Sequence, residues 1–428
     1  MTALLIVLLL LVLILVRVPV SFAILGAGIV GIAFVSGPSV LDGVMQTAPA
    51  TSVMSFSLSA VPLFILMAHL IMLSGLLDSL FDATRAVVGR IRGGTAVASI
   101  AAGTAFASVS GSSTAAAATL AQTSTVKMID EGYSPKMAGG SVAVVGTLAA
   151  MIPPSIILVF YAITAEVSVG DQLVAGFVPG LIIALSLIAT MYISMIRNPQ
   201  NVPHGEKASW ADKGRAIVSA FPLVFVFLAV VGSIYLGVAT ATEAAALGCV
   251  AALILVTAMG KFSLSAIGKT LVESTKTTAM IFAIIVGAHV FGHFLTETRV
   301  TPTIVAWVGG LALPAVVIML FIAMLYLILG FFMDQIAIIA LTVPVVLPLA
   351  VELGYDPVWF GIFVVLLAEI GLVTPPMGLN VFVVAKSSGQ RVEDVFRGAA
   401  PYVGAMLLIA LVFLIFPALV LWLPNSMQ

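Results

Sequence analysis

Long apolar runs are the feature that most constrains how this chain of 428 residues folds. In lipid, a spanning segment satisfies its backbone hydrogen bonds only as a helix or in a closed barrel, and a helix needs about 20 apolar residues. About ten such segments are present, near 2–16, 20–36, 54–77, 137–165, 174–196, 217–238, 242–259, 271–295, 357–385 and 399–423. We therefore expect an all-α polytopic integral membrane protein.

Composition excludes the soluble classes of protein. The chain is 62% hydrophobic and 8% charged, whereas soluble domains are about 45–50% apolar and about 25% charged. A net charge of −1 leaves no basic face for nucleic acid. The first apolar run, Thr2 to Val16, has no preceding positive residue and no following cleavage-site pattern, so we expect an uncleaved first span in the lipid bilayer.

The two halves of the chain share residues at a constant offset of 222 positions. The matches include the Gly-Tyr-x-Pro and Pro-Pro elements, and they are Gly132/Gly354, Tyr133/Tyr355, Pro135/Pro357, Pro153/Pro375, Pro154/Pro376, Gly176/Gly398 and Pro179/Pro401. Internal duplication with interrupted segments at equivalent places is typical of secondary transporters. We predict a first repeat over 1–196, a polar linker over 197–215 and a second repeat over 216–428.

Two apolar stretches, near 95–129 and 304–350, are interrupted by small, polar or proline residues, and we expect them to be re-entrant helical hairpins. If they re-enter and the linker is cytoplasmic, each half crosses the membrane five times and the repeats are inverted. Arg299 is then the only basic residue outside the cytoplasmic stretches. This distribution agrees with the positive-inside rule, and we expect a cytoplasmic central linker.

The first candidate for chemistry is the polar run Ser108–Thr114, set between alanine-rich arms. Hydroxyls at membrane depth are costly unless they are bonded, and irregular backbone is tolerated only where it lines a cavity or is buried. One interpretation is a hairpin tip that coordinates a cation; the other is close packing of small residues. At the same offset, Ser112 falls opposite Asp334, an intramembrane carboxylate that we expect in a cation site or, alternatively, as an anchor for a helix terminus.

The second candidate is the pair of tandem prolines at 153–154 and 375–376. Proline removes a backbone donor and clashes with the preceding turn, so each pair breaks a helix near mid-span and frees carbonyl oxygens. Hard cations such as Na⁺ prefer oxygen ligands, and Ser155, Thr374 and Asn380 add side-chain oxygens nearby. Two kinks at equivalent positions, each beside polar oxygens, favour paired ion sites over simple kinks.

Three weaker features have a simpler interpretation. The G-x-G-x-x-G pattern over 26–31 lies inside an apolar span without βαβ context, so we expect helix packing. Glu369 is an acid in an apolar run that either serves a proton or ion path or pairs structurally with a Ser or Thr. His289 and His293 show no ligand spacing, and we expect them to pack or lie at interfaces.

At these motifs the chain resembles a known family. The stretches SGSSTAAAATLAQ, MIPPSI, GFFMD and TPPMGLNVF, in this order, resemble the large membrane subunit of tripartite ATP-independent periplasmic (TRAP) transporters, and the likeness extends from Arg17 to the final apolar run. One departure is Ala241, where the family often has proline. The resemblance implies an elevator-type secondary transporter in the bacterial inner membrane. It would import a small organic acid, such as a C4-dicarboxylate or sialic acid, with Na⁺ and without a cofactor.

The resemblance also implies partners and site residues. The partners are a small four-helix membrane subunit and a periplasmic substrate-binding protein. The cation-site candidates, carried over by position, are Ser110, Gly111, Ser112, Pro153, Asp334, Thr374, Pro375 and Gly378. The candidates for substrate or second-ion contacts are Ser113, Thr114, Ser155 and Asn380.

Three other functions are weighed against this one. A single-component Na⁺- or H⁺-coupled carboxylate carrier with similar hairpins would need no partner subunit. An intramembrane serine protease is suggested by Ser110-Gly111, which resembles part of a G-x-S-G motif, but Ser108 occupies the first glycine position and no histidine is placed to act as base. A passive channel fits less well, because two closed hairpins suit occlusion.

Overall fold

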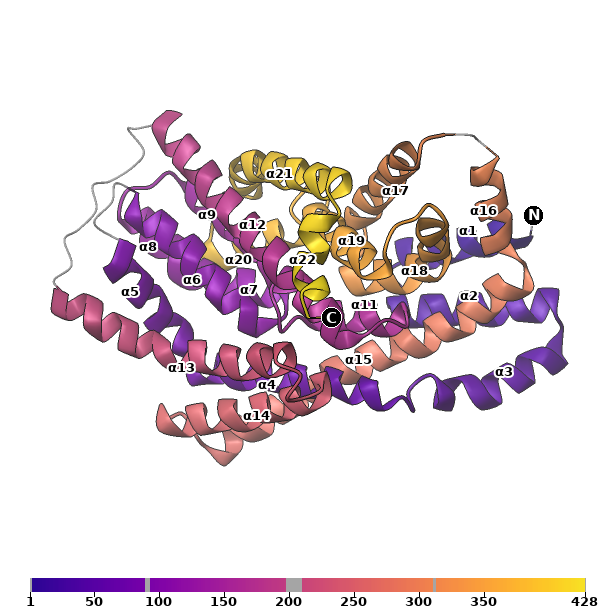
Figure 1. Ribbon diagram of the computed structural model, residues 1–428, viewed down its shortest axis with the longest axis horizontal. Helices are drawn as coiled ribbons and strands as arrows, with labels where there is room; N and C mark the ends of the chain where they lie inside the picture. Colours follow the sequence, from indigo (N-terminus) through magenta and orange to yellow (C-terminus); the bar gives the residue numbers. More distant parts are fainter. Residues whose placement is uncertain (1, 89–92, 198–209, 311–312, 428) are drawn as a thin grey trace.

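Helices make up the regular structure of this computed structural model, which describes residues 2–88, 93–197, 210–310 and 313–427 (Figure 1). No strand occurs in those ranges. Six described helices are long and apolar enough to cross a membrane, or seven if the pair Pro135–Met151 and Ile156–Thr164, bent by 45°, is one span. Eight shorter apolar helices among the described residues have 10–17 residues. The predicted all-helical, multi-spanning class is confirmed.

Many helices of the second half begin close to 222 positions after a helix of the first, although the helix Leu264–Glu297 is continuous where the first half is broken. The first half holds α1 (Thr2–Leu15), α2 (Val20–Val35), α3 (Pro38–Thr51), η1 (Phe56–Ser59), α4 (Ala60–Ser74), α5 (Leu76–Val88), α6 (Gly94–Ser110), α7 (Ser113–Leu120), η2 (Ala121–Thr125), α8 (Val126–Asp130), α9 (Pro135–Val145), α10 (Leu148–Met151), α11 (Ile156–Thr164) and α12 (Val169–Arg197). The second holds α13 (Trp210–Tyr235), α14 (Ala241–Ala258), α15 (Leu264–Glu297), α16 (Val300–Gly309), α17 (Ala315–Gly330), α18 (Gln335–Glu352), α19 (Pro357–Gly371), α20 (Leu379–Ser388), α21 (Val392–Ile415) and α22 (Ala418–Asn425). The inverted relation of the halves stays a prediction.

Three details differ from the apolar pattern. The second interrupted stretch, 304–350, contains the end of α16 as well as the hairpin pair α17 and α18, because the chain turns near residue 310 before the hairpin begins. Helices α3 and α5 were not expected, since they carry polar residues that break the hydropathy signal. Of the predicted linker, residues 198–209 lie outside the described residues, and α13 already begins at Trp210.

The helices form two layers, which we call the scaffold and the core. In the scaffold, α2 packs along α15 and α4 packs along α14, and these helices lie with α3 and α13 on one long side of the molecule (Figure 1). The core holds α6–α12 and α17–α22, and its two halves interlock through contacts of α9 with α21, α7 with α20, and α11 with α18. The layers meet where α4 touches α6 and α11, and where α15 touches α18.

Glycines bring helix backbones into direct contact in both layers. A Cβ on Gly28 would lie 2.9 Å from the backbone nitrogen of Phe291, so the glycine pattern in α2 serves packing against α15, as expected. In the core, a Cβ on Gly140 would overlap the backbone of Gly398, which joins α9 to α21. Small residues permit this close approach, which is the main source of helix association in lipid.

Candidate functional site

The tip of the first hairpin packs directly on the first proline break. Helix α6 ends at Ser110, and Gly111 adopts a left-handed conformation with φ of +59° that glycine alone adopts without strain. A Cβ at Gly111 would lie 3.1 Å from Cγ1 of Ile156 and 3.4 Å from the carbonyl oxygen of Pro154. The predicted tip at Gly111 and the predicted break at Pro154, 43 positions apart in the sequence, therefore lie in direct contact.

Consecutive hydroxyls of this tip point in different directions. Ser110 Oγ donates to the carbonyl of Ala107 at 3.5 Å. Ser112 caps α7 by accepting from the backbone nitrogen of Ala115 at 3.5 Å, and its Oγ lies 3.4 Å from Oγ1 of Thr114. The structure thus keeps Ser112 and Thr114, both half-buried, together at the tip.

The first break itself is fully buried. Residues 152–155, including Pro153, are all buried, and the peptide bond between the two prolines is cis. Ser155 caps α11: its Oγ accepts from the backbone nitrogen of Leu158 at 3.3 Å and donates to the carbonyl of Ala150 at 2.6 Å. This hydroxyl bridges the two helix ends at the break, so its hydrogen atom is already engaged.

The second hairpin has an exposed tip on a tightly packed base. Asp334 is exposed and caps α18 by accepting from the backbone nitrogen of Ala337 at 3.0 Å. At the base, a Cβ on Gly330 would lie 2.9 Å from Cα of Gly371, so the end of α17 touches the end of α19. The anchoring role that was the alternative for Asp334 is present, since its carboxylate caps α18.

The second break is open where the first is closed. Pro375 and its neighbours up to Met377 are exposed, and Thr374 Oγ1 donates to the carbonyl of Ile370 at 2.5 Å. Gly378 takes φ of +47° at the start of α20, where a Cβ would overlap the ring of Phe396. The site residues of the second half therefore face a more accessible environment than those of the first.

Asn380 is placed differently from the other predicted ligands. Its side chain is fully buried in α20, and neither its amide nitrogen nor its amide oxygen has a hydrogen-bond partner. Its backbone nitrogen donates to the carbonyl of Leu372 at 3.1 Å across the break. Burying an amide without hydrogen-bond partners costs free energy, so this group is available to a ligand or a water molecule.

Among the described residues, no hydrogen bond joins the tip of the first hairpin to the tip of the second.

Glu369 pairs with a serine, which is one of the two interpretations that the sequence left open. The carboxylate is fully buried in α19, and its Oε1 accepts from the Oγ of Ser113 at 2.7 Å, a contact between the two halves of the chain. Its Oε2 has no partner. The only available signal was an acid inside the apolar run 357–373, which does not reveal a partner 256 positions away.

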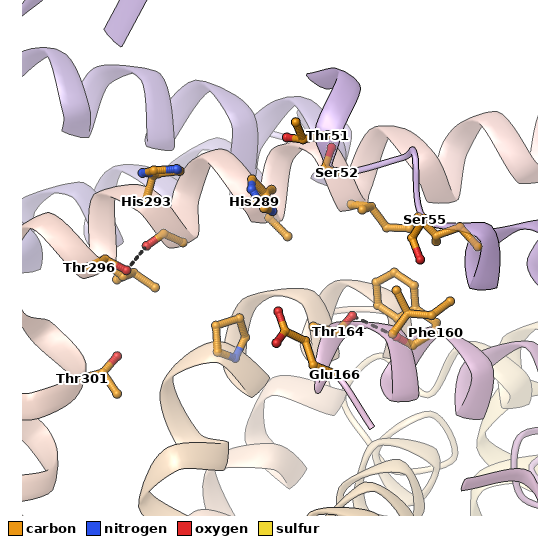
Figure 2. Close-up of a pocket in the computed structure, with 17 residues that line it drawn as sticks. Thr51, Ser52, Ser55, Phe160, Thr164, Glu166, His289, His293, Thr296 and Thr301 are labelled. Carbon is orange, nitrogen blue, oxygen red and sulfur yellow. Dashed lines mark hydrogen bonds between the residues drawn. The ribbon is translucent and has the colours of Figure 1, made fainter. Parts of the chain in front are cut away.

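A polar cavity of about 580 Å³ lies between the scaffold and the core. Figure 2 shows Glu166, which follows α11 in the core, across the cavity from His289 and His293 on α15 of the scaffold. These histidines were expected to pack or lie at interfaces, and they line this one. Hydroxyls complete the wall, from Thr51, Ser52, Ser55, Thr164, Thr296 and Thr301.

Glu166 also lines a second cavity, of about 710 Å³, that shares Ser55 and Ile163 with the first. Its φ of +55° places a non-glycine residue in the left-handed region, after the last turn of α11. Such a residue is uncommon and costs about 1–2 kcal/mol. The boundary between the layers is therefore hollow and polar on both sides of Glu166, whose side chain is exposed and whose backbone is strained.

Comparison with known proteins decides the family. The family model described as "Tripartite ATP-independent periplasmic transporter, DctM component" matches residues 7–419. The chain belongs to this family. It is 35% identical over 372 residues to the C4-dicarboxylate TRAP transporter large permease protein DctM of Pseudomonas aeruginosa, with 86% of each chain covered. It is 29% identical to the sialic acid TRAP transporter large permease protein SiaM of Vibrio cholerae, with 87% of each covered.

Among solved structures, this DctM-family chain is similar to the YdaH transporter of Alcanivorax borkumensis. The TM-score is 0.66 at 15% identity, with 89% of this chain and 90% of that chain covered, which shows a shared fold. The predicted resemblance to the TRAP large subunit is thus confirmed, and the relatives are transporter permeases. Ser110 of the protease alternative donates to a backbone carbonyl, and no described histidine bonds to it.

Proposed function

We propose that this DctM-family permease imports a small organic acid together with Na⁺, by an elevator movement of the core against the scaffold. The observation that carries the proposal is a contact inside the core. Gly111, at the tip of the first hairpin, packs on Pro154, where the proline pair breaks the helix. Such broken helices, with freed carbonyls and free N-termini near mid-membrane, are where secondary transporters hold ions and substrates.

The Na⁺ ligands would come from the tips and the breaks. In the first half we assign Ser110, Gly111, Ser112 and Pro153, whose carbonyls and hydroxyls surround the Gly111–Pro154 contact. In the second half we assign Asp334, Thr374, Pro375 and Gly378. Oxygen donors of this kind suit a hard cation, and the positive ion would offset the negative charge of the Asp334 carboxylate.

The substrate anion would be held by helix N-termini. Four helices begin at the tips and breaks, namely α7 at Ser113, α11 at Ile156, α18 at Gln335 and α20 at Leu379. Each N-terminus carries a partial positive charge and unpaired backbone donors. The side chains that we assign to the substrate or a second ion are those of Ser113, Thr114, Ser155 and Asn380. The amide nitrogen and the amide oxygen of Asn380 both lack a hydrogen-bond partner. The C4-dicarboxylate and sialic acid relatives support an organic acid as substrate.

The layered fold supports an elevator movement. The core interlocks across both halves, whereas the boundary with the scaffold holds two polar cavities on either side of Glu166. A hollow, polar boundary lets two rigid layers slide with less repacking than a close-packed one. The core would therefore carry tips, breaks and cargo together.

Family membership supports a proposal for the partners and the location. The family description names a tripartite transporter of which DctM is one component. We assign a small four-helix membrane subunit and a periplasmic substrate-binding protein as the other two. The complex would lie in the bacterial inner membrane with the linker around 197–215 in the cytoplasm, consistent with the distribution of Lys and Arg.

The test is uptake by proteoliposomes that contain this chain and its small subunit. Labelled C4-dicarboxylate or sialic acid is supplied on its binding protein, with or without an inward Na⁺ gradient. Uptake that needs both Na⁺ and the binding protein supports the proposal and identifies the substrate. Uptake with Na⁺ alone would favour a single-component carrier, and uptake of an authentic substrate without Na⁺ dependence would refute the ion assignment.

A further inference from the structure

We propose that His289 and His293 form a binding site for a divalent transition-metal ion such as Zn²⁺, and that the bound ion arrests transport by linking the scaffold to the core through Glu166. The arrest rests on the elevator movement proposed above, whereas the binding site does not. The site lies in the polar cavity of about 580 Å³ between the two layers. The described residues that line this cavity include none of the proposed Na⁺ ligands.

The two imidazoles share one face of α15. His289 and His293 lie four positions apart on this helix, and their ring centroids are 5.9 Å apart. Residues with this spacing are neighbours on a helix surface. Zinc lies about 2.0–2.1 Å from each ligating ring nitrogen, so two rings that share one ion have centroids roughly 5–6 Å apart. The histidine pair is therefore spaced for one shared ion.

Helix packing does not account for these two histidines. Both are exposed, whereas Gly287 on the same helix packs against α2. At the offset of 222 positions, His289 and His293 correspond to Met67 and Ile71 of α4, which are both buried. The fold therefore has apolar side chains at the equivalent positions that pack, and histidines where the helix faces the cavity.

Neither imidazole is engaged by another group of the protein. In the described part of the chain, no hydrogen bond or ion pair involves His289 or His293, and their recorded ring contact is with each other. A neutral imidazole has one ring nitrogen with a free lone pair, so each histidine can supply a metal ligand without breaking a contact. Imidazole suits zinc, copper, iron and nickel, whereas Mg²⁺ and Ca²⁺ prefer oxygen ligands.

The rest of the cavity wall is rich in hydrogen-bond acceptors. The hydroxyls of Thr51, Thr164 and Thr296 donate to backbone carbonyls of their own helices at 3.0, 2.9 and 3.0 Å. Each hydroxyl has one hydrogen atom, so these groups can only accept from a ligand. The carboxylate of Glu166 faces the same cavity (Figure 2). Such a wall suits a cation with its bound water and disfavours an anion.

Glu166 lies across the cavity and belongs to the other layer. In this conformation no three His, Cys, Asp or Glu side chains among the described residues converge to hold a metal ion, so the two imidazoles and water would hold it here. A core movement that brings Glu166 against α15 would complete a site of two nitrogens, one carboxylate oxygen and one water, the four-coordinate arrangement that zinc favours. An ion that binds this arrangement more tightly shifts the population towards it.

The binding site is tested with Cu²⁺ alone, on the purified chain with its small subunit in detergent. Pulsed electron paramagnetic resonance should detect two imidazole nitrogens on the ion. His289→Ala and His293→Ala should each weaken binding by roughly tenfold or more per folded protein, as judged by size-exclusion chromatography. His69→Ala is the matched control, since His69 lies on α4 outside this cavity, with Nδ1 2.8 Å from Oγ of Ser274. Equal affinity in the wild type and both cavity variants would overturn the site.

The arrest is tested with Zn²⁺ during Na⁺-dependent uptake by proteoliposomes, and each variant is compared with its own rate without metal. Buffered external Zn²⁺ should inhibit the wild type, and a chelator should restore uptake. His293→Ala and Glu166→Gln should need roughly tenfold more Zn²⁺ or higher for the same inhibition. Glu352→Gln, an exposed acid on α18 that does not line the cavity, is the matched control and should be inhibited like the wild type.

The two parts of the proposal fail separately. Inhibition that persists in His293→Ala would overturn the action of zinc at this site. Glu166→Gln should keep the two-nitrogen Cu²⁺ signal, and equal inhibition of this variant and the wild type would overturn the link between the layers. If the wild type shows no Na⁺-dependent uptake, the proposed function fails, while the Cu²⁺ measurement still decides the binding site.

Discussion

Gly111→Ala tests whether the first hairpin tip must close on the proline break for transport. Gly111 has φ of +59°, and a Cβ there would lie 3.1 Å from Cγ1 of Ile156. An L-residue in the left-handed region costs about 1–2 kcal/mol, whereas the Ile156 contact is with the flexible end of a side chain and adds little. Since about 1–2 kcal/mol changes an equilibrium by a factor of roughly 5–30, we expect the closed tip to lose that factor in population.

The assay is Na⁺-dependent uptake at limiting Na⁺, compared with thermal stability in detergent. Gly111→Ala should lower uptake per folded protein by roughly 5–30-fold. Gly132→Ala is the matched control, because Gly132 has φ of +93° but its Cβ would meet open space. It should cost similar stability without changing uptake per folded protein. The reasoning fails if Gly111→Ala transports normally, or if Gly132→Ala loses as much uptake as Gly111→Ala.

Three other substitutions separate structural roles from functional ones. Asp334→Asn keeps a side-chain cap for α18 but removes the charge, so thermal stability should be unchanged while Na⁺-dependent uptake is lost; retained Na⁺ dependence would leave Asp334 as a cap only. Pro375→Ala restores a backbone donor at the second break, and the ratio of uptake with and without Na⁺ should fall; an unchanged ratio would indicate a simple kink. Glu166→Gly relieves the left-handed strain and should stabilise the detergent-solubilised protein by about 1 kcal/mol in thermal unfolding, whereas no gain would show that contacts in the cavity hold Glu166 there.

The sequence predicts the helices better than it predicts the site. Apolar runs and tandem prolines have a local physical cause, and the structure has helices with breaks at Pro153 and Pro375. The direction of each hydroxyl does not have a local cause of that kind. Ser112 has extended backbone angles as the cap of α7, whereas Ser113 is the first helical residue. Neighbouring serines therefore face different partners, and only the packing of α19 reveals which one meets Glu369.

The duplication also explains why equivalent positions are not equivalent sites. Ser112 at the first tip corresponds to Asp334 at the second. Glu369 corresponds to Thr147, whose hydroxyl donates to the carbonyl of Val144, three positions earlier, at 2.6 Å. At both pairs the first half supplies a hydroxyl and the second half supplies a carboxylate. The two carboxylates differ in turn, since Asp334 is exposed and Glu369 is fully buried. The packing around each acid, and not its place in the repeat, therefore sets its contacts: Asp334 caps its own helix α18, whereas Glu369 accepts a hydrogen bond from Ser113 of the other half.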